Sequence, residues 1–272
     1  MSSPELDAYL ARIGYTGPRE PTLAVLDAVH QAHVHHIPFE NLDIMLGRTI
    51  RVDVASVRAK LVDARRGGYC FEQNTLLCAA LRELGFDVDV LLARVCRSGG
   101  WQVPAGEVTG RTHMILLVRL QGERWICDTG FGGSSLMRPA PLRAGAEVVA
   151  GPWVHRIVPT SDGRQLMQWR TVSGSVDWED LFVFTLEPQF PIDVEMSNHY
   201  VCTWPDSRFV LTLTAQRIQP MRRVALRNRE FSVDVGEGPV TRRLESRDEV
   251  VALLAEEFGL RFAADAPLRT PQ

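Results

Sequence analysis

The first 85 residues place apolar side chains at the spacing of an amphipathic α-helix. Apolar positions recur every three or four residues in 4–13, 21–35 and 53–64, which predicts three helices. A fourth helix is expected to begin at or beside Cys70 and to end at Gly85, a residue suited to a helix C-terminus. This pattern indicates a helical bundle over residues 1–85.

From Phe86 the period of the apolar positions changes to two. The alternation in 88–94, 113–120, 124–129 and 181–186 predicts strands, so a mostly β region is expected to follow the helices. A loop rich in Gly and Pro, Ser98–Gly110, is long enough to be functional or mobile.

Beyond Pro191 the pattern is mixed. Short apolar runs predict strands at 208–213, 224–226 and 231–235, and helical spacing predicts a helix over 247–258. The residues from Ala263 onward are expected to be loosely ordered. The last part of the chain is therefore expected to be a small α/β segment.

Composition narrows the function. The 272 residues include 30 Lys+Arg and 33 Asp+Glu, a net charge of -3 with scattered arginines, which argues against a nucleic-acid surface. No segment approaches the roughly 20 apolar residues of a membrane helix, and the N-terminus has no signal-peptide pattern. Five cysteines without C-x-x-C spacing argue against a disulfide framework and a zinc site. We expect a cytoplasmic protein with small-molecule partners.

Cys70 is the candidate nucleophile, because it lies at a predicted helix N-terminus in "RRGGYCFEQN", residues 65–74. That position and a neighbouring cation both favour the reactive thiolate. Gly67 and Gly68 would allow a tight turn and leave room for a substrate, while the first N–H groups of the helix are suited to an oxyanion. The alternative is that Cys70 is a small buried apolar side chain.

Histidines supply the candidate base. His30, His33, His35 and His36 crowd one segment, but no Cys or carboxylate stands at ligand spacing, so a solvated helix end is expected there and not a metal site. His113 differs, because it begins the apolar strand "THMILLV", where a buried ring needs a polar partner.

Asp128 is the candidate partner of His113. With a two-residue turn at Gln121-Gly122, Asp128 would lie opposite Ile115 and on the same face as His113, at a diagonal distance of roughly 7 to 8 Å. A three-residue turn would reverse this parity. The carboxylate would orient the imidazole toward the thiol, which is the logic of a Cys-His-Asp triad. The following "TGFGGSS" fits either a phosphate or pantetheine cradle or a plain turn.

Four motifs in order resemble the bacterial arylamine N-acetyltransferases: "HHIPFENLDI", "RRGGYCFEQN", "THMILLV" and "CDTGFGG". "SNHYVCTWPDSRF", residues 197–209, extends the resemblance over nearly the whole chain. The resemblance implies an α+β fold in three parts, an N-terminal helical bundle (1–85), a central β-barrel (86–190) and a C-terminal α/β lid (191–272). It also implies a triad like that of cysteine proteases where the first two parts meet.

The resemblance further implies an acetyl-CoA-dependent arylamine and arylhydrazine N-acetyltransferase without a metal. Acetyl-CoA is the co-substrate, and the acetyl group passes through an acetyl-cysteinyl intermediate in a ping-pong cycle. The implied residues are Cys70 as nucleophile, His113 as base, Asp128 as its orienter, Phe39 and Phe131 in the acceptor pocket, Thr112, Gly130 and Gly132 near the coenzyme, and Glu40 as the structural partner of Arg65 or Arg66.

Alternatives stay open at this level. The same triad would serve an amide synthase that acts on a polyketide-type acyl donor, a protease or a transglutaminase-like hydrolase, and a non-catalytic binding module can share the fold. Gln73 and Thr129 depart from the residues that bacterial members often carry there, which puts details of the pocket in doubt. The acceptor and the oligomeric state, a homodimer included, are not fixed by the sequence.

Overall fold

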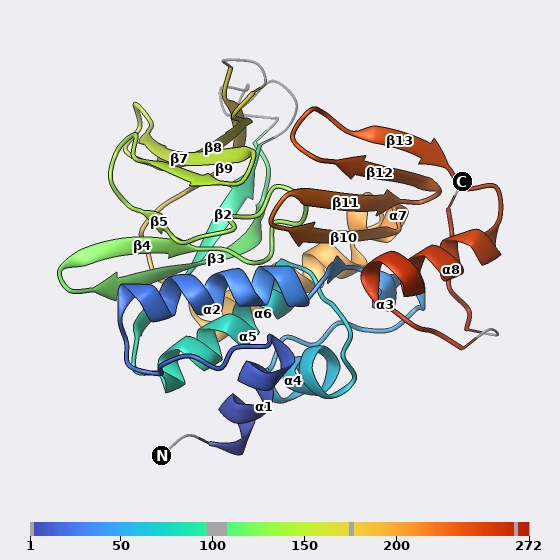
Figure 1. Cartoon of the computed structure of the whole chain (residues 1–272), viewed down its shortest axis with the longest axis horizontal. Helices are drawn as coiled ribbons and strands as arrows, with labels where there is room; N and C mark the ends of the chain where they lie inside the picture. Colours follow the sequence, from blue (N-terminus) through green and yellow to red (C-terminus); the bar gives the residue numbers. More distant parts are fainter. Residues whose placement is uncertain (1–2, 97–107, 174–176, 264–265, 272) are drawn as a thin grey trace.

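The protein is described by a computed structural model over residues 3–96, 108–173, 177–263 and 266–271. Most of the predicted loop at 98–110 lies outside these residues. Figure 1 shows helices below two sheets that lie side by side. Among the described residues, no helix has both the length and the apolar character needed to cross a membrane.

The helical part follows the predicted order. Its elements are α1 (Pro4–Arg12), α2 (Leu23–His36), α3 (Leu42–Met45), α4 (Val54–Arg58), the π-helical turn η1 (Ala59–Asp63) and α5 (Cys70–Glu83). Side chains of Ser3, Thr22 and Asp53 accept N–H groups of the first turns, as N-caps do. The single helix predicted over 53–64 is divided, since its second half widens into η1 just before the R-G-G motif.

The middle of the chain forms an eight-stranded antiparallel sheet. Its strands are β2 (Asp87–Val95), β3 (Arg111–Leu120), β4 (Glu123–Cys127), β5 (Ala140–Pro141), β6 (Glu147–Ala150), β7 (Trp153–Pro159), β8 (Gln165–Thr171) and β9 (Glu179–Phe184). They are ordered β5-β4-β3-β2-β9-β8-β7-β6, and β5 also contacts β7, so the sheet nearly closes into a barrel. Leu91, Ile115 and Phe182 belong to the apolar cluster of this sheet.

The remaining elements are α6 (Pro191–Thr203), α7 (Arg208–Leu211), β10 (Thr214–Gln219), β11 (Arg222–Arg227), β12 (Glu230–Asp234), β13 (Val240–Arg243) and α8 (Arg247–Phe258). The second sheet has the order β1-β10-β11-β12-β13, in which β1 (Phe39–Glu40) comes from the helical part. The strand predicted over 208–213 is wrong. Ser207 caps a short helix there by accepting the N–H of Phe209, and a short apolar run does not distinguish the two structures.

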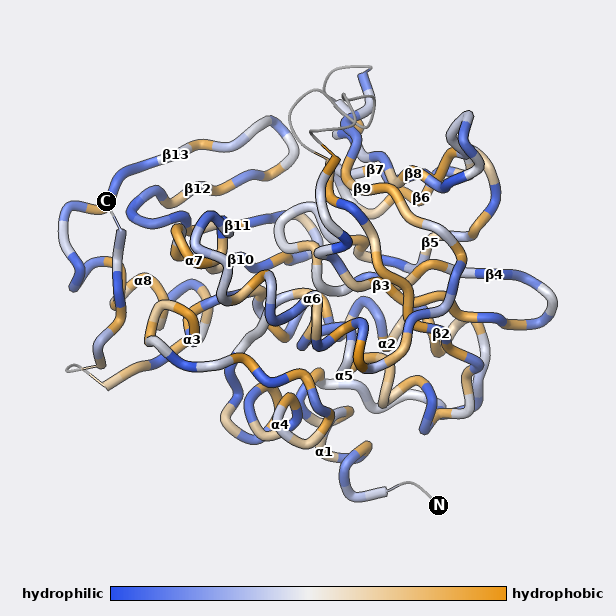
Figure 2. The backbone as a smooth tube through the Cα atoms, turned by 180° about the vertical axis from the view of Figure 1, so that it is seen from behind, coloured by the Kyte–Doolittle hydropathy of each residue, from blue (hydrophilic) through white to orange (hydrophobic). Residues whose placement is uncertain are grey.

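One apolar cluster joins the helices to the second sheet and to residues near the end of the chain. It includes Leu10 of α1, Leu77 of α5 and Leu254 of α8, and it also contains Leu268. The prediction of a loosely ordered tail is wrong for residues 266–271, because Leu268 is buried and the N–H of Arg269 donates to the carbonyl of Met45 at 3.0 Å. Figure 2 shows hydrophobic colour where β2 and β3 run toward the helices and hydrophilic colour at the β3–β4 turn.

Candidate active site

Cys70 is the first residue of α5. Its neighbour Tyr69 is the N-cap, and the N–H of Tyr69 donates to Glu72 Oε2 at 3.1 Å, so the start of the helix is fixed from the third position. The Cys70 side chain is buried, and Sγ lies 3.8 Å from the carbonyl oxygen of Thr112 on β3. The thiol therefore faces the strand that carries His113.

The sequence had suggested that Gly67 and Gly68 leave space for a substrate. In the structure, protein atoms fill that space. A Cβ on Gly67 would lie 2.2 Å from the carbonyl oxygen of Pro38, and one on Gly68 would lie 2.8 Å from Glu72 Oε2. The segment at Phe39 runs beside Gly68 and is bound to it by two backbone hydrogen bonds. The glycines allow the P-F-E-N and R-G-G motifs to touch.

His113 lies on β3 and Asp128 directly follows β4, and their side chains are in contact. The turn between the strands is Gln121-Gly122, both with positive φ, and Leu116 lies opposite Cys127, so Asp128 comes next to Ile115. Nε2 of His113 is 2.8 Å from Oδ2 of Asp128, and both side chains are buried. Of the two turns that the sequence left open, the two-residue turn is present, and it brings these side chains together.

The charges of this pair support each other. Burial alone would lower the pKa of His113, but the charge and hydrogen bond of Asp128, with Cys70 beside the ring, raise it to about 10. Burial would raise the pKa of Asp128, yet the imidazolium holds it below its usual value. A neutral imidazole held by a carboxylate at this place can take the proton of a neighbouring thiol, and the imidazolium that forms can return it.

Asn74, Gly130 and His30 also bind Asp128, and the sequence pointed neither to Asn74 nor to this role of His30. Asn74 Nδ2 donates to Asp128 Oδ1 at 3.0 Å, and the N–H of Gly130 donates to the same oxygen at 2.9 Å. The N–H of Asp128 donates to His30 Nε2 at 3.1 Å. A signal for Asn74 was available, because it lies four residues after Cys70 on the same face of α5.

Aromatic rings cover the imidazole. The rings of Phe131 and Phe182 each have centroids 4.9 Å from that of His113, and they are 5.1 Å from each other. The sequence did not predict Phe182 at this site, because its place depends on how β9 packs in the sheet. The Phe39 ring lies 6.0 Å from that of Phe209, and among the described residues no ring contact joins it to Phe131.

The glycine segment after Asp128 packs on the protein itself. A Cβ on Gly130 would lie 2.5 Å from Cys70 Cα, and Gly132, with φ 83°, would bring one to 2.6 Å from Gln216 Oε1. Thr112 offers its carbonyl oxygen to Cys70, while its hydroxyl bonds Gly110. Thr112 and Gly130 thus lie beside Cys70, whereas Gly132 packs against Gln216.

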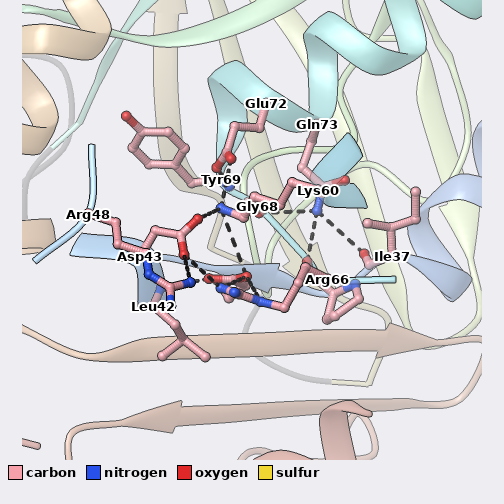
Figure 3. Close-up of polar contacts among 12 residues, drawn as sticks. Ile37, Leu42, Asp43, Arg48, Lys60, Arg66, Gly68, Tyr69, Glu72 and Gln73 are labelled. Carbon is pink, nitrogen blue, oxygen red and sulfur yellow. Dashed lines mark hydrogen bonds and ion pairs between the residues drawn. The ribbon is translucent and has the colours of Figure 1, made fainter. Parts of the chain in front are cut away.

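A buried charge network lies behind the R-G-G motif (Figure 3). Arg66 donates to Glu40 Oε1 from Nη2 at 2.7 Å and from Nε at 3.0 Å. Lys60 Nζ lies 2.7 Å from both Asp43 Oδ2 and Glu72 Oε1. Arg66 is therefore the partner of Glu40, whereas Arg65 has a φ of 51° and forms no ion pair with Glu40 among the described residues.

Electrostatics favour an ionised Lys60. Burial would lower the pKa of Lys60, but three carboxylates around it raise the pKa instead. Burial also raises the pKa of Glu72 to about 7, against the opposing effect of Lys60. A cavity of about 310 Å³ opens beside this network, lined by charged side chains that include Arg48 and Arg51, and it lies apart from His113 and Asp128.

The histidine segment of α2 is not a solvated helix end throughout. His30 and His33 have no exposed surface, whereas His36 is exposed. His33 bonds the Tyr9 hydroxyl at 2.9 Å and Gln73 Oε1 at 2.7 Å. Gln73 Nε2 donates in turn to the carbonyls of Pro38 and Gly68. The prediction failed because it read an amphipathic helix with one polar face and missed these partners.

Among the described residues, no group of three or more His, Cys, Asp or Glu side chains could hold a metal ion. The five cysteines are free thiols. A buried thiol, a helix start and an imidazole–carboxylate pair together suit acyl transfer through a covalent thioester.

Comparison with known proteins gives the family. A family model described as N-acetyltransferase matches residues 22–266. The chain is 38% identical to the arylamine N-acetyltransferase of Mycolicibacterium smegmatis over 94% of this chain and 92% of that protein. It is 37% identical to that of Escherichia coli K12 over 95% and 89% of the two chains.

Solved structures agree. The arylamine N-acetyltransferase of Salmonella typhimurium has a TM-score of 0.87 and 34% identity over 96% of this chain and 92% of that chain. The Mycobacterium marinum enzyme in complex with CoA has a TM-score of 0.85 and 32% identity over 93% and 92%. These neighbours confirm the α+β fold that the resemblance implied. The chain is an acyltransferase that belongs to the arylamine N-acetyltransferase family.

Proposed function

We propose that the protein transfers the acetyl group of acetyl-CoA to aromatic amines and hydrazines in a ping-pong cycle through Cys70. The observation that carries the proposal is the His113–Asp128 pair, 2.8 Å apart, beside a helix that begins at a buried cysteine. The relative whose structure was solved with CoA supports a CoA thioester as donor. The reaction belongs to the cytoplasm in this proposal, which five free thiols support.

In the first half-reaction, the Cys70 sulfur attacks the thioester carbonyl after its proton has passed to His113. The N–H groups of Glu72 and Gln73 donate to the Tyr69 carbonyl, and the two N–H groups before them, of Cys70 and Phe71, stabilise the oxyanion. The bond to the CoA sulfur breaks, CoA leaves as a thiol with the proton from His113, and the acetyl group stays on Cys70. Asp128 keeps the imidazolium in place during this step.

In the second half-reaction, the amine nitrogen attacks the acetyl-cysteine carbonyl. Its proton passes to His113 and then to the Cys70 sulfur as the carbon–sulfur bond breaks, which regenerates the thiol. Phe131, with Phe182 beside it, offers a flat apolar surface next to His113 for the aromatic acceptor. Phe39 is kept as the second pocket residue, Thr112, Gly130 and Gly132 as the coenzyme side, and the Glu40–Arg66 pair as structural support.

The test is an intact mass of the purified protein after brief exposure to acetyl-CoA without acceptor, followed by peptide mapping. One acetyl group on Cys70 that is lost on addition of an arylamine or hydrazine is the expected result. A Cys70→Ala protein should remain folded and take no acetyl group, and continued acetyl transfer by it would refute the mechanism. An unmodified Cys70 in the native protein would favour an amide synthase, or a hydrolase if peptides are cleaved without CoA.

A further inference from the structure

The glycine segment that follows Asp128 is held at its far end by two side chains of the second sheet. The N–H of Gly133 donates to Gln216 Oε1, and its carbonyl accepts a hydrogen bond of 2.5 Å from Arg223 Nη1. Because Ile218 lies opposite Arg223, Gln216 and Arg223 are diagonal neighbours on one face of β10 and β11. Both backbone groups of Gly133 are thus bound by residues from the last third of the chain.

Gln216 is held in place for this contact. It is buried, and its Nε2 donates to Thr214 Oγ1 at 3.1 Å, which turns Oε1 toward Gly133. A Cβ added to Gly132 would lie 2.6 Å from Gln216 Oε1, and one added to Gly133 would lie 2.9 Å from the same atom. Only glycines at these two positions let the backbone approach Gln216 so closely.

Arg223 is an unusual residue for a role in packing alone. Its guanidinium is buried 3.9 Å above the Trp153 ring and 5.1 Å from that of Trp169. Burial lowers the pKa of Arg223 to about 9, and among the described residues no carboxylate lies within ion-pair distance. A buried cation without such a partner costs free energy, whereas an apolar side chain would fill the same space without that cost. The hydrogen bond that Arg223 donates to Gly133 explains why an arginine stands at this buried position.

The other end of the segment lies at the nucleophile. Gly130 packs against Cys70, and its N–H donates to Asp128. The Phe131 ring contacts the His113 ring. Two residues later, the backbone of Gly133 forms its hydrogen bonds to Gln216 and Arg223. A shift of Gly133 would therefore move the segment over the thiol while the His113–Asp128 contact, which β3 and β4 position, could stay in place.

We propose that Gln216 and Arg223 are positioning residues that hold segment 130–133 where the acyl group of a CoA thioester is received. This inference rests on the proposed function and extends it to the second sheet, which sets the binding of the donor rather than the reactivity of the thiol. Small thiol reagents do not need the segment, so the two properties separate by experiment.

The experiment compares Arg223→Met, Arg223→Lys and Gln216→Met with Arg222→Met. Arg222 is the matched control, since it lies on the same strand but pairs with Glu257 of α8 and is partly exposed. We expect kcat/KM for acetyl-CoA to fall by about tenfold or more in Arg223→Met and Gln216→Met, mainly through KM. Arg223→Lys should recover part of this loss, because an ammonium can still donate to the carbonyl. Alkylation of Cys70 by iodoacetamide should stay as in the native protein, and Arg222→Met should change neither rate.

Amide hydrogen exchange of residues 129–134 adds a readout that does not depend on turnover, and Gln216→Met should accelerate it. Native kinetics and native exchange in both variants would overturn the inference, and so would alkylation that falls in step with acetyl transfer. If the native protein takes no acetyl group from acetyl-CoA, the proposed function fails. Accelerated exchange without slower alkylation would then still support the positioning role, and unchanged exchange would overturn it.

Discussion

Buried histidines of this protein hold different charges because their partners differ. Burial lowers the pKa of His30 to about 4, and those of His33 and His155 to about 3. Each of these three bonds a neutral group: a backbone N–H, an amide and a hydroxyl, or a carbonyl. Within the part of the chain that the structure describes, His113 is the one buried histidine that bonds a carboxylate, and its pKa rises to about 10. One carboxylate therefore distinguishes the candidate base from rings that only support the structure.

Asn74 should matter for activity through Asp128. Asn74→Leu removes a hydrogen bond that helps to lower the pKa of Asp128, so this pKa should rise and the acid limb of the kcat/KM profile should move to higher pH. We expect acetyl transfer to fall roughly 10- to 100-fold. Thr75→Val, one residue further on α5, is the control. A native pH profile for Asn74→Leu would contradict the role given to this amide.

Lys60 should be essential to the charge network. Lys60→Met leaves Asp43 and Glu72 buried without their shared cation, and we expect the free energy of unfolding to fall by about 3 to 5 kcal/mol. Arg48→Met, whose side chain is mostly exposed and 3.8 Å from Asp43, should cost less than about 1 kcal/mol. Urea unfolding measures both. Equal midpoints for the two variants would show that the network adds no stability.

At this scale the sequence predicts residues that lie within one motif. Cys70 was singled out by its local context, and Asp128 by the short turn that relates it to His113. Lys60 and Asp43 carry no such mark, because their role depends on η1 and α3 meeting α5 in space. Arg65 and Arg66 are equivalent in the sequence, and only the left-handed backbone of Arg65 separates them.

The β3–β4 hairpin shows how one element determines the site. Gln121 and Gly122 both have positive φ, as in a type I′ turn, and this turn fixes the register that brings Asp128 to His113. Elements of this kind follow from local sequence. Contacts such as Phe39 beside Gly68, or α7 in place of a strand, depend on partners distant in sequence and were not predicted.

The turn can be tested by two substitutions. Gln121→Asn should stabilise the protein by about 1 kcal/mol, because Asn adopts left-handed backbone more readily than Gln. Gly122→Val should destabilise it by about 1 to 2 kcal/mol through backbone strain alone, since a Cβ there would meet no atom within 4 Å. Thermal unfolding of both variants gives the answer, and a stabilising Gly122→Val would exclude this turn.

For the whole molecule, stability should be greatest near pH 6.5. Below this pH the unfolded chain takes up a proton on each of His30, His33 and His155 while the folded protein keeps them neutral, so stability falls toward pH 4. Glu72, with its raised pKa of about 7, takes up a proton in the folded protein over the same range, which cancels the contribution of one histidine. The net is about 3 kcal/mol per pH unit. Above pH 6.5, the stability from charged His113 is lost as the pH rises through about 10.

Denaturant titrations from pH 4.5 to 9 measure this dependence. His155→Gln keeps a donor for the carbonyl of Ser134 but does not titrate, so its acid slope should be shallower by about 1.4 kcal/mol per pH unit. An unchanged slope would mean that His155 is protonated in the fold.

The buried tail offers another test of the whole molecule. Leu268→Ala should lower the free energy of unfolding by about 2 to 5 kcal/mol, because the side chain belongs to the main apolar cluster. Val240→Ala, at a site that is 77% exposed, is the control and should change stability by less than about 0.5 kcal/mol. Similar effects of the two changes would show that the tail contributes nothing to the core.

The tail also has a consequence for synthesis. Met45 and Ile44 receive hydrogen bonds from Arg269, and the Arg66 guanidinium lies over the Phe262 ring, so the segment around the candidate nucleophile is completed by residues made more than 190 positions later. Strand β1 likewise cannot pair until β10 has been synthesised. A ribosome that adds about 5 to 20 residues per second would leave this apolar surface uncovered for roughly ten seconds or more. Chaperones would meet the helical part during that interval.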